Sequence, residues 1–370
     1  MLKKEKKVPE LRFTGFEEDW EWDKLGEISD MYQPTTISQS QLTESGIPVF
    51  GANGYIGFYK QANHSTDQVT ISARGEKTGT INFVSGPVWI TGNSMVVNVD
   101  DRPLDKIFLF YDLRNMSLKK YITGGAQPQL TREVLDNIPI FFPSEKDEQS
   151  QIGEFFENLD DIIEFYKEKL KKLKKLKQAY LQVIFPRKGE KVPKLRISNF
   201  HGEWNPCNLG SLVDITTGKL DANAMVENGK YDFYTSGIKK YKIDIPSFEG
   251  PAITIAGNGA TVGHMHLADG EFNAYQRTYV LTNFKIDRQF IFAEIGNKLP
   301  RKIAEEARTG NIPYIVLDML TELKIMIPSP SEAAEIGKFF KNFDDLIDLQ
   351  RQKIDRLESL KKAYLQKMFV

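Results

Sequence analysis

The sequence of 370 residues has one cysteine, Cys207, four histidines and no long run of apolar residues. A single cysteine cannot form an internal disulfide or supply a cysteine-rich metal site. No stretch of about 18 uninterrupted apolar residues is present, and the first residues, MLKKEKKVPELRF, carry charge without the apolar core of a signal peptide. We therefore expect a cytoplasmic protein in a reducing compartment, with no membrane segment.

The sequence also lacks an excess of either charge. Its 49 Lys and Arg residues balance 50 Asp and Glu residues, which leaves a formal net charge of −1. This balance argues against a strongly basic protein that binds DNA by itself, so any DNA binding would depend on local patches or on partner proteins. With 41% hydrophobic and 27% charged residues, the composition is typical of a globular protein of two or three domains.

Residues that carry out catalysis are missing as well. Gly-Lys pairs occur at residues 218–219 and 337–338, but neither has the upstream glycine or the following hydroxyl residue of a phosphate-binding loop. The sequence Asn-Ile-Pro-Tyr at residues 311–314 is similar to the base-gripping element of amino-methyltransferases, yet its second residue differs and no glycine-rich turn for S-adenosylmethionine precedes it. We interpret Pro313 as part of a structural turn, because residues 125–129 hold a proline in the same place of an internal repeat. No nucleophile with a neighbouring base is recognisable, so we predict no catalytic residue and no cofactor on this chain.

Two kinds of polar pair are similar to metal or acid–base sites. His264 and His266 alternate on one face of an expected strand, but no third ligand is recognisable nearby, so we predict a surface or core pair and no metal site. Asp-Asp pairs stand at residues 160–161 and 344–345, in the first half of two expected helices. We predict that they compensate the helix dipole and form hydrogen bonds between subunits.

The chain is one unit of about 184 residues written twice. Residues 9–13 (PELRF) recur as residues 193–197 (PKLRI), and Ile-Gly-x-Phe-Phe at residue 152 recurs at residue 336. Between residues 152–184 and 336–368, 16 of 33 positions are identical, whereas the middles of the two copies align only in patches. This pattern indicates a tandem duplication in which function keeps the ends of the copies alike and permits the middles to differ.

Each copy has a globular part and a helical part. Residues 9–143 and 193–328 are rich in Gly, Asn, Thr and Tyr with short apolar runs, which is typical of short strands and turns. Residues 145–184 and 331–369 have almost no Gly or Pro and carry Lys, Glu, Leu and Phe at helical spacing. We predict an α+β fold of two strand-rich mixed α/β domains, related by the duplication and separated by two long antiparallel coiled-coil helices. The expected boundaries are 1–143 for the first globular domain, 144–185 for the first helix, 186–328 for a linker and the second globular domain, and 329–370 for the second helix.

The helical parts present more apolar surface than two helices need to cover each other. Steps of four and three residues from Ile152 and from Ile336 give a heptad seam, which favours packing of the two helices on each other. A flanking row raises the count to three apolar positions per heptad, the width of a bundle face. We predict that the surplus binds partner helices; the alternative is that it packs on the chain's own globular domains. The predicted bundle and partner interface consists of Phe155, Phe156, Ile162, Ile163, Leu176, Tyr180, Phe339, Phe340, Leu346, Ile347, Leu360 and Tyr364.

Two further features of the helices have mechanical or electrostatic interpretations. Thirty-three residues of helix make a rod of roughly 50 Å, which would act as a ruler between the two domains. Seven lysines lie in the stretch Lys167–Lys177, while the equivalent stretch Arg351–Lys361 mixes acids with its bases. We therefore interpret the lysines as a solvated helix face, with a phosphate contact as the alternative.

Two glycine-rich loops occupy corresponding places in the globular parts. Residues 72–79 read SARGEKTG, and residues 256–263 read AGNGATVG. Glycines let a backbone approach a phosphate closely, while Arg, Lys and Asn contact base edges or phosphates. The loops are therefore candidate ligand sites, although a surface turn without a ligand has the same composition.

The whole arrangement resembles the specificity subunit of type I restriction-modification enzymes over essentially all 370 residues. The resemblance rests on two copies of Pro-x-Leu-Arg with a following Phe, Trp and Leu-Gly, then a variable domain, then a long helix that begins after Pro-Ser and carries Ile-Gly-x-Phe-Phe, Asp-Asp and Lys-x-Ala-Tyr-Leu-Gln. It implies two target-recognition domains, each of which reads one half of a bipartite, asymmetric DNA site, and helices that set the unread gap. It also implies a subunit that recognises DNA without catalysing a reaction.

The resemblance implies double-stranded DNA and several proteins as partners. Two methyltransferase subunits would dock on the helices and carry S-adenosylmethionine for adenine methylation, and restriction subunits, which use ATP and Mg, would join them for cleavage. By analogy, residue type and loop position suggest six residues for DNA contact: Arg74, Lys77, Asn93, Asn258, Gln276 and Arg277. The alternatives are a non-enzymatic scaffold with two ligand-binding domains on a coiled coil, and a self-contained methyltransferase, which the missing cofactor motif disfavours.

Overall fold

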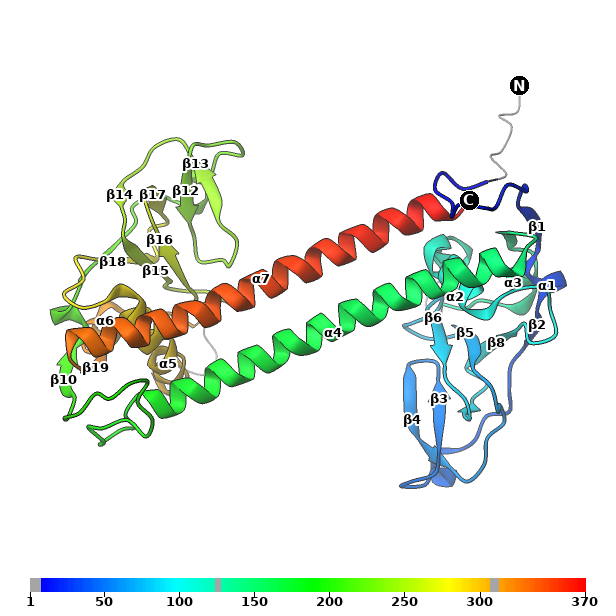
Figure 1. The fold of residues 1–370 in the computed structure, drawn as a ribbon, viewed down its shortest axis with the longest axis horizontal. Coiled ribbons are helices and arrows are strands. Elements are labelled where there is room, and N and C mark those ends of the chain that lie inside the picture. Colours follow the sequence, from blue (N-terminus) through cyan, green and yellow to red (C-terminus); the bar gives the residue numbers. More distant parts are fainter. Residues whose placement is uncertain (1–7, 124–127, 307–312) are drawn as a thin grey trace. The chain divides into compact units, whose positions relative to one another are not determined.

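The computed structural model describes residues 8–123, 128–306 and 313–370, whose elements are drawn in Figure 1. The chain divides into two compact units. The first comprises the chain up to Lys167 together with Gln352–Val370, and the second comprises Glu168–Arg351. Each unit therefore combines one globular part with a segment of each long helix. Residues 125–127 of the predicted turn and residues 311–312 of the methyltransferase-like sequence lie outside the described residues.

The globular part of the first unit contains small sheets and short helices. Its strands are β1 (Glu21–Lys24), β2 (Asp30–Tyr32), β3 (Ile47–Gly51), β4 (Gly54–Tyr59), β5 (Gln68–Ser72), β6 (Ile81–Val84), β7 (Trp89–Ile90), β8 (Ser94–Asn98) and β9 (Pro139–Phe142). Its helices are α1 (Leu25–Ile28), α2 (Lys106–Met116) and α3 (Arg132–Asp136), with 3-10 turns η1 (Gln39–Gln41) and η2 (Leu118–Tyr121). The main sheet has the antiparallel order β2-β8-β5-β6. A second sheet, β4-β3-β7, pairs β3 with β7 in parallel, and β1 pairs with β9.

The globular part of the second unit repeats this plan. Its strands are β10 (Asn205–Asn208), β11 (Asp214–Thr217), β12 (Tyr231–Tyr234), β13 (Tyr241–Ile243), β14 (Phe248–Glu249), β15 (Ala252–Ala256), β16 (Met265–Ala268), β17 (Glu271–Ala274), β18 (Thr278–Thr282) and β19 (Lys324–Ile327). Its helices are α5 (Arg288–Glu306) and α6 (Leu317–Thr321), with 3-10 turns η3 (Leu209–Ser211) and η4 (Ala222–Ala224). The main sheet has the order β11-β18-β15-β16, beside the sheet β13-β12-β17-β14 and the ribbon β10-β19.

The two main sheets correspond residue by residue at an offset of 184. Strands β5, β6 and β8 recur as β15, β16 and β18 at that offset, with the same pairing register. The sequence comparison therefore understates the likeness of the two globular parts. β5 (QVTIS) and β15 (AITIA) are buried throughout, so the five positions stay buried although three of the five residues differ and alanine replaces Gln68 and Ser72.

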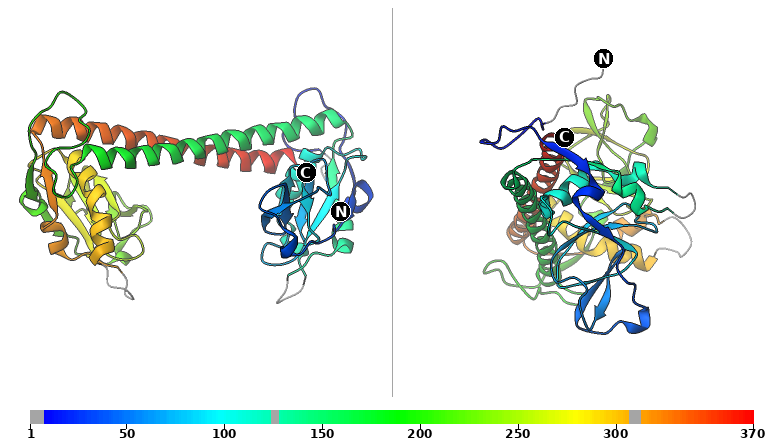
Figure 2. Two further views of the ribbon diagram at one scale, coloured as in Figure 1. Left: turned by 90° about the horizontal axis from the view of Figure 1, so that it is seen from below. Right: turned by 90° about the vertical axis from the view of Figure 1, so that its right-hand side faces the viewer.

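The two long helices are α4 (Lys146–Ile184) and α7 (Pro330–Met368), and in each unit the strands lie to one side of the helix segments (Figure 2). In the first unit, the rings of Phe155 and Tyr364 pack edge to face. Farther along α4, Lys167 forms an ion pair with Glu358 at 2.7 Å. Residue numbers on α7 thus fall as those on α4 rise, so the two segments run antiparallel in this unit. Contacts of Lys177 with Asp344, and of Tyr180 with Phe339, show the same direction in the second unit.

Lys177 and Lys361 occupy the same position of the heptad seam in the two copies, and each forms an ion pair. Lys177 Nζ lies 2.5 Å from Asp344 Oδ1, and Lys361 forms the equivalent pair with Asp160. The Tyr111 hydroxyl also donates a hydrogen bond to Asp160, at 2.9 Å. One carboxylate of each Asp-Asp pair is therefore engaged inside its own unit, and the bonds between subunits stay a prediction.

The residue that follows each long helix is buried in the unit that contains the other copy's globular part. Phe185, after α4, packs in the second unit against Phe290 and Phe340. Phe369, after α7, packs in the first unit against Phe108 and Phe156. Each long helix therefore begins in the unit of its own copy and ends in the core of the other.

The repeated Pro-x-Leu-Arg motif supplies a buried ion pair to each unit. The Arg12 guanidinium contacts the carboxylate of Glu148, near the start of α4, with two bonds of 2.6 and 2.7 Å. Arg196 and Glu332 form the corresponding pair at 3.4 Å. Burial of a carboxylate is costly unless a cation compensates it, which explains why the motif recurs at the entry of both copies.

The histidine pair is half-buried. The ring centroids of His264 and His266 lie 4.6 Å apart. Burial, together with the neighbouring His264, lowers the pKa of His266 to about 4, so its ring is neutral near pH 7. Among the described residues, no group of three or more His, Cys, Asp or Glu side chains is placed to hold a metal ion.

Candidate nucleic-acid interface

The two glycine-rich loops have the same backbone conformation. One joins β5 to β6 and the other joins β15 to β16. Gly75 and Gly79 in the first loop, and Gly259 and Gly263 in the second, have φ angles between 81° and 90°, a region that glycine adopts without steric cost. In each loop the second of these glycines donates its amide hydrogen to the last residue of the preceding strand, at 2.8 Å.

Each loop is joined to the residue that precedes the central strand of its sheet. In the first unit, the Ala73 amide donates to the Asn93 carbonyl at 3.2 Å. In the second unit, the Gly257 amide donates to the Arg277 carbonyl at 2.8 Å. The side chains of Arg74 and Asn258, one residue after these amides, are therefore held at equivalent positions in the two units.

A third segment lies along each loop. Gln129 forms a β-bridge with Arg74 in the first unit, and Tyr314 forms a β-bridge with Asn258 in the second. Neither Gln129 nor Tyr314 was a predicted site residue. The signal that could have found them is the proline that precedes each one, which the sequence analysis interpreted only as a structural turn.

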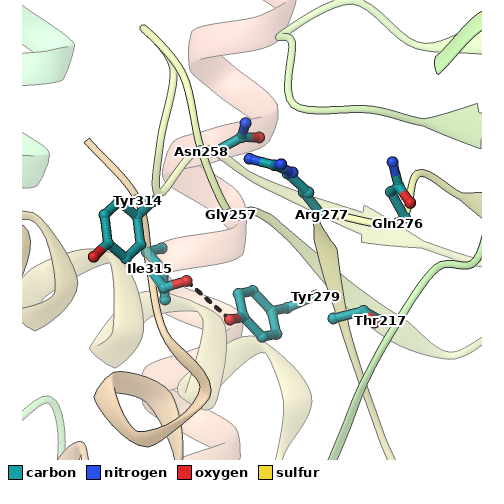
Figure 3. Close-up of a pocket in the computed structure, with 8 residues that line it drawn as sticks. All are labelled: Thr217, Gly257, Asn258, Gln276, Arg277, Tyr279, Tyr314 and Ile315. Carbon is teal, nitrogen blue, oxygen red and sulfur yellow. Dashed lines mark hydrogen bonds between the residues drawn. The ribbon is translucent and has the colours of Figure 1, made fainter. Parts of the chain in front are cut away.

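In the second unit these three segments surround a depression of about 180 Å³, shown in Figure 3. It is lined by Thr217, Gly257, Asn258, Gln276, Arg277, Tyr279, Tyr314 and Ile315. The Tyr279 hydroxyl donates a hydrogen bond of 2.9 Å to the Ile315 carbonyl, which fixes the third segment at the base of the depression. Burial raises the pKa of Tyr279, so this hydroxyl keeps its proton near neutral pH.

The three predicted site residues of the second unit are brought together at the rim. Figure 3 shows the side chains of Asn258 and Arg277 directed to the same side, with Gln276 beside Arg277 in the turn that precedes β18. Asn258 Oδ1 accepts a hydrogen bond of 2.6 Å from Ser236 Oγ, and Gln276 Nε2 lies 3.4 Å from Asp221 Oδ2. The exposed Arg277 guanidinium has no hydrogen bond or ion pair with another described residue.

Two predicted residues of the first unit, Arg74 and Asn93, occupy the positions of Asn258 and Arg277, whereas Lys77 matches Thr261. Arg74, Lys77 and Asn93 are all exposed. Lys77 Nζ donates to the Asn53 carbonyl at 3.2 Å, whereas the side chains of Arg74 and Asn93 have no such partner in the described part of the chain. The site therefore offers hydrogen-bond donors and positive charge to a ligand, without a nucleophile or a general base.

The predicted interface on the long helices divides into a buried and an exposed set. Phe156, Ile163, Phe340 and Ile347 are buried inside their own units, so a partner does not reach them. Phe155, Tyr180, Phe339 and Tyr364 are half-buried and stack on aromatic neighbours in their own units. Part of the predicted interface therefore packs within the chain, on the other helix segment (Phe155 with Tyr364) as well as on the globular part (Phe155 with Phe13), and the binding of partner helices stays a prediction.

The exposed set forms a row that repeats at the offset of 184. It consists of Ile162, Phe165 and Leu176 on α4 and of Leu346, Leu349 and Leu360 on α7, all between 44% and 62% exposed. Phe165 and Leu349 were not among the predicted residues, although their helical spacing from Ile162 and Leu346 is the signal that finds them.

Comparison with known families decides what this architecture is. The model of the type I restriction-modification DNA specificity domain matches the chain twice, at residues 17–175 and 201–359. The chain belongs to the type I restriction-modification specificity family. The resemblance noted in the sequence is therefore confirmed: the chain is a specificity subunit with two target-recognition domains, the non-catalytic DNA-recognition component of such systems.

Individual relatives agree with this assignment. The EcoDI specificity subunit of a type I restriction enzyme from Escherichia coli is 32% identical over 164 residues, which cover 44% of this chain and 36% of that protein. The MjaVIII specificity subunit from Methanocaldococcus jannaschii is 23% identical over 98% of this chain and 95% of its own length. The crystal structure of a type I S subunit from M. genitalium, 19% identical, superposes with a TM-score of 0.79 over 98% of this specificity subunit and 99% of that chain.

Proposed function

We propose that this specificity subunit directs adenine methylation and restriction to a bipartite, asymmetric DNA sequence, with each globular domain reading one half. The observation that carries the proposal is the pair of equivalent sites, built on one backbone in both domains but bearing different side chains. Matching backbones present side chains to DNA in the same way, and different side chains select different bases. The functional division follows the sequence: domains at 1–143 and 186–328, and helices at 144–185 and 329–370.

The experiment that tests this proposal is a genome-wide map of methylated adenines in the host with the gene intact, deleted and restored. We expect modification at one split, asymmetric motif to disappear on deletion and to return on restoration. If the map does not change even when active methyltransferase subunits are supplied, the proposal is wrong. A scaffold with two ligand-binding domains then becomes the better description.

We further propose that Arg74, Lys77 and Asn93 contact one half-site, and that Asn258, Gln276 and Arg277 contact the other. The exposure of five of these residues, all except the half-buried Asn258, and the unpartnered guanidinium groups of both arginines support this assignment. Replacement of Arg277 by Ala should weaken binding to the specific duplex by about 1–3 kcal/mol, measured with the subunit assembled with its methyltransferase partners. Arg301→Ala is the control, since Arg301 is also exposed but pairs with Glu305 on α5.

The exposed row of the long helices is the proposed docking surface for two methyltransferase subunits. Apolar side chains at helical spacing on an exposed face fit partner helices, with which the antiparallel pair would form a coiled-coil bundle. These partners, together with the restriction subunits, would supply S-adenosylmethionine, ATP and Mg, so that this chain needs no cofactor of its own. Near-zero net charge fits a complex in which other subunits share the phosphate contacts.

A further inference from the structure

Two side-chain positions are equivalent in the two domains. The loop position is Arg74 in the first domain and Asn258 in the second, one residue after the amide that binds the neighbouring strand. The second position, called the strand position because it directly precedes β8 or β18, is Asn93 in the first domain and Arg277 in the second, and its carbonyl accepts that amide. The loop position is also fixed from its other side by a β-bridge in both domains. Two amide hydrogen bonds and two β-bridges thus give the two positions the same backbone surroundings in both domains.

The residues at these positions are exchanged between the domains. The first domain has Arg at the loop position and Asn at the strand position, while the second has Asn at the loop position and Arg at the strand position. Both domains therefore present one arginine and one asparagine, in opposite order, on the same backbone. Other equivalent positions, such as Lys77 and Thr261, differ without such an exchange.

Arginine and asparagine have distinct preferences in the major groove. A guanidinium donates two hydrogen bonds to O6 and N7 of guanine, and a carboxamide bonds N6 and N7 of adenine. The side chains of Arg74, Asn93 and Arg277 are exposed and have no hydrogen-bond partner among the described residues. Asn258 uses only Oδ1, as the acceptor for Ser236, so its amide hydrogens are free to donate.

We propose that the loop and strand positions form a two-residue reader in each domain, whose Arg contacts a guanine and whose Asn contacts an adenine. Because the two residues are exchanged, the two half-sites carry these purines in opposite order relative to their domains. This inference rests on the proposed function, since it names the bases that the two domains read.

The test is an exchange of the two residues within one domain. The double variant Arg74→Asn, Asn93→Arg gives the first domain the arrangement of the second. It is expressed with active methyltransferase subunits, and the methylated motif is mapped beside that of the parent protein. We expect only the half-site of the first domain to change, with guanine and adenine exchanging places at its contacted base pairs. The other half-site is the internal control.

If the double variant directs no methylation, two single variants test the two-residue reader instead. Arg74→Lys and Arg277→Lys keep the charge but lose the planar, two-pronged donor. We expect each to reduce discrimination for guanine at one base pair of its own half-site by roughly 5- to 150-fold, with the rest of the motif intact. A phosphate contact would instead keep the parent motif and lower methylation evenly.

The outcomes separate this inference from the proposed function. If the parent protein directs methylation to a split motif but the Lys variants keep full discrimination at every position, the reader is wrong and the proposed function stands. If the double variant methylates the parent motif unchanged, the reader is likewise overturned. If the parent protein directs no methylation to any split motif, the proposed function itself fails.

Discussion

At the scale of single residues, each domain buries one carboxylic acid on the helix that packs against its main sheet. Asp105 and Asp287 cap α2 and α5, and Asp112 and Glu294 each follow seven residues later. Lys298 Nζ lies 2.7 Å from the Glu294 carboxylate, whereas Asp112 Oδ2 has no hydrogen-bond partner among the described residues. Burial raises the pKa of both acids to about 7.

The raised pKa of Asp112 predicts a pH-dependent stability. Because its pKa is higher in the folded than in the unfolded chain, the folded chain binds this proton more tightly. The folding stability that comes from the bound proton is complete below about pH 4 and is lost as the pH rises through 7. Asp112→Asn removes this loss, so the variant should be about 1–3 kcal/mol more stable than the parent at pH 8, with a smaller difference at pH 5. Urea denaturation at the two pH values measures this, with the exposed Asp101→Asn as control. An equal difference at both pH values would contradict the prediction.

The buried Arg12–Glu148 pair predicts a large cost when its cation is removed. Arg12→Ala leaves the fully buried Glu148 carboxylate without its partner, which should destabilise the first unit by about 3–5 kcal/mol. The matched control is Arg102→Ala, which breaks an exposed pair with Asp30 and should have a much smaller effect on stability. Hydrogen exchange of the first unit's amides compares the two variants. An equal loss of protection in the two variants would show that burial does not determine how much the Arg12–Glu148 pair contributes to stability.

At the scale of elements, the two faces of each long helix differ in burial. The seam side is buried by the partner helix segment and by the globular part, while the repeated row from Ile162 to Leu360 stays exposed. Exposed apolar rows of this size on a helix pair are typical of interaction surfaces. The two faces can therefore be tested separately by substitution.

We predict that Ile162→Asp with Leu346→Asp abolishes co-elution with the methyltransferase subunits on a sizing column, because charge would be buried at the docking surface. The circular dichroism spectrum and melting curve of the isolated chain should stay unchanged, since both side chains are exposed. Phe156→Asp is the contrasting control: it places a charge in the core of the first unit and should unfold that unit. Retained co-elution of the double variant would refute the docking surface.

At the scale of the whole molecule, the duplicated copies exchange the ends of their helices. Phe185 belongs by sequence to the first copy but is buried in the second unit, and Phe369 belongs to the second copy but is buried in the first. Neither unit is therefore completed by one copy alone. The period seen in the sequence does not coincide with the compact units of the fold.

This exchange predicts where truncations of side chains act. Phe185→Ala should destabilise the second unit and Phe369→Ala the first, each by about 3–5 kcal/mol, the cost of removing a buried aromatic ring. Limited proteolysis followed by mass spectrometry locates the unit that opens, and each variant is the control for the other. Opening of the first unit by Phe185→Ala would contradict the exchange.

Much of the fold and part of the site can be predicted from the sequence. The long helices, the duplication and the two glycine-rich loops are visible because they depend on local spacing and on repeated residues. The equivalence of the main sheets is hidden, because burial at matching positions does not require the same residue, as Gln68 and Ala252 at the start of QVTIS and AITIA show. The offset of 184 already aligns Arg74 with Asn258 and Asn93 with Arg277, and the structure adds that the aligned residues share their backbone contacts.

The sequence by itself determined the period of 184 residues, the helix faces and the family, because these depend on residue types at fixed spacing along the chain. The tertiary structure decided which apolar helix residues are buried, which lysine pairs with which aspartate, and which side chains share a binding site. Lys177 meets Asp344 across 167 residues of chain, and Phe185 reaches the core beside Phe340. Such contacts form only when the antiparallel helix segments pack together. The spacing of residues along the chain does not specify which distant residues then meet.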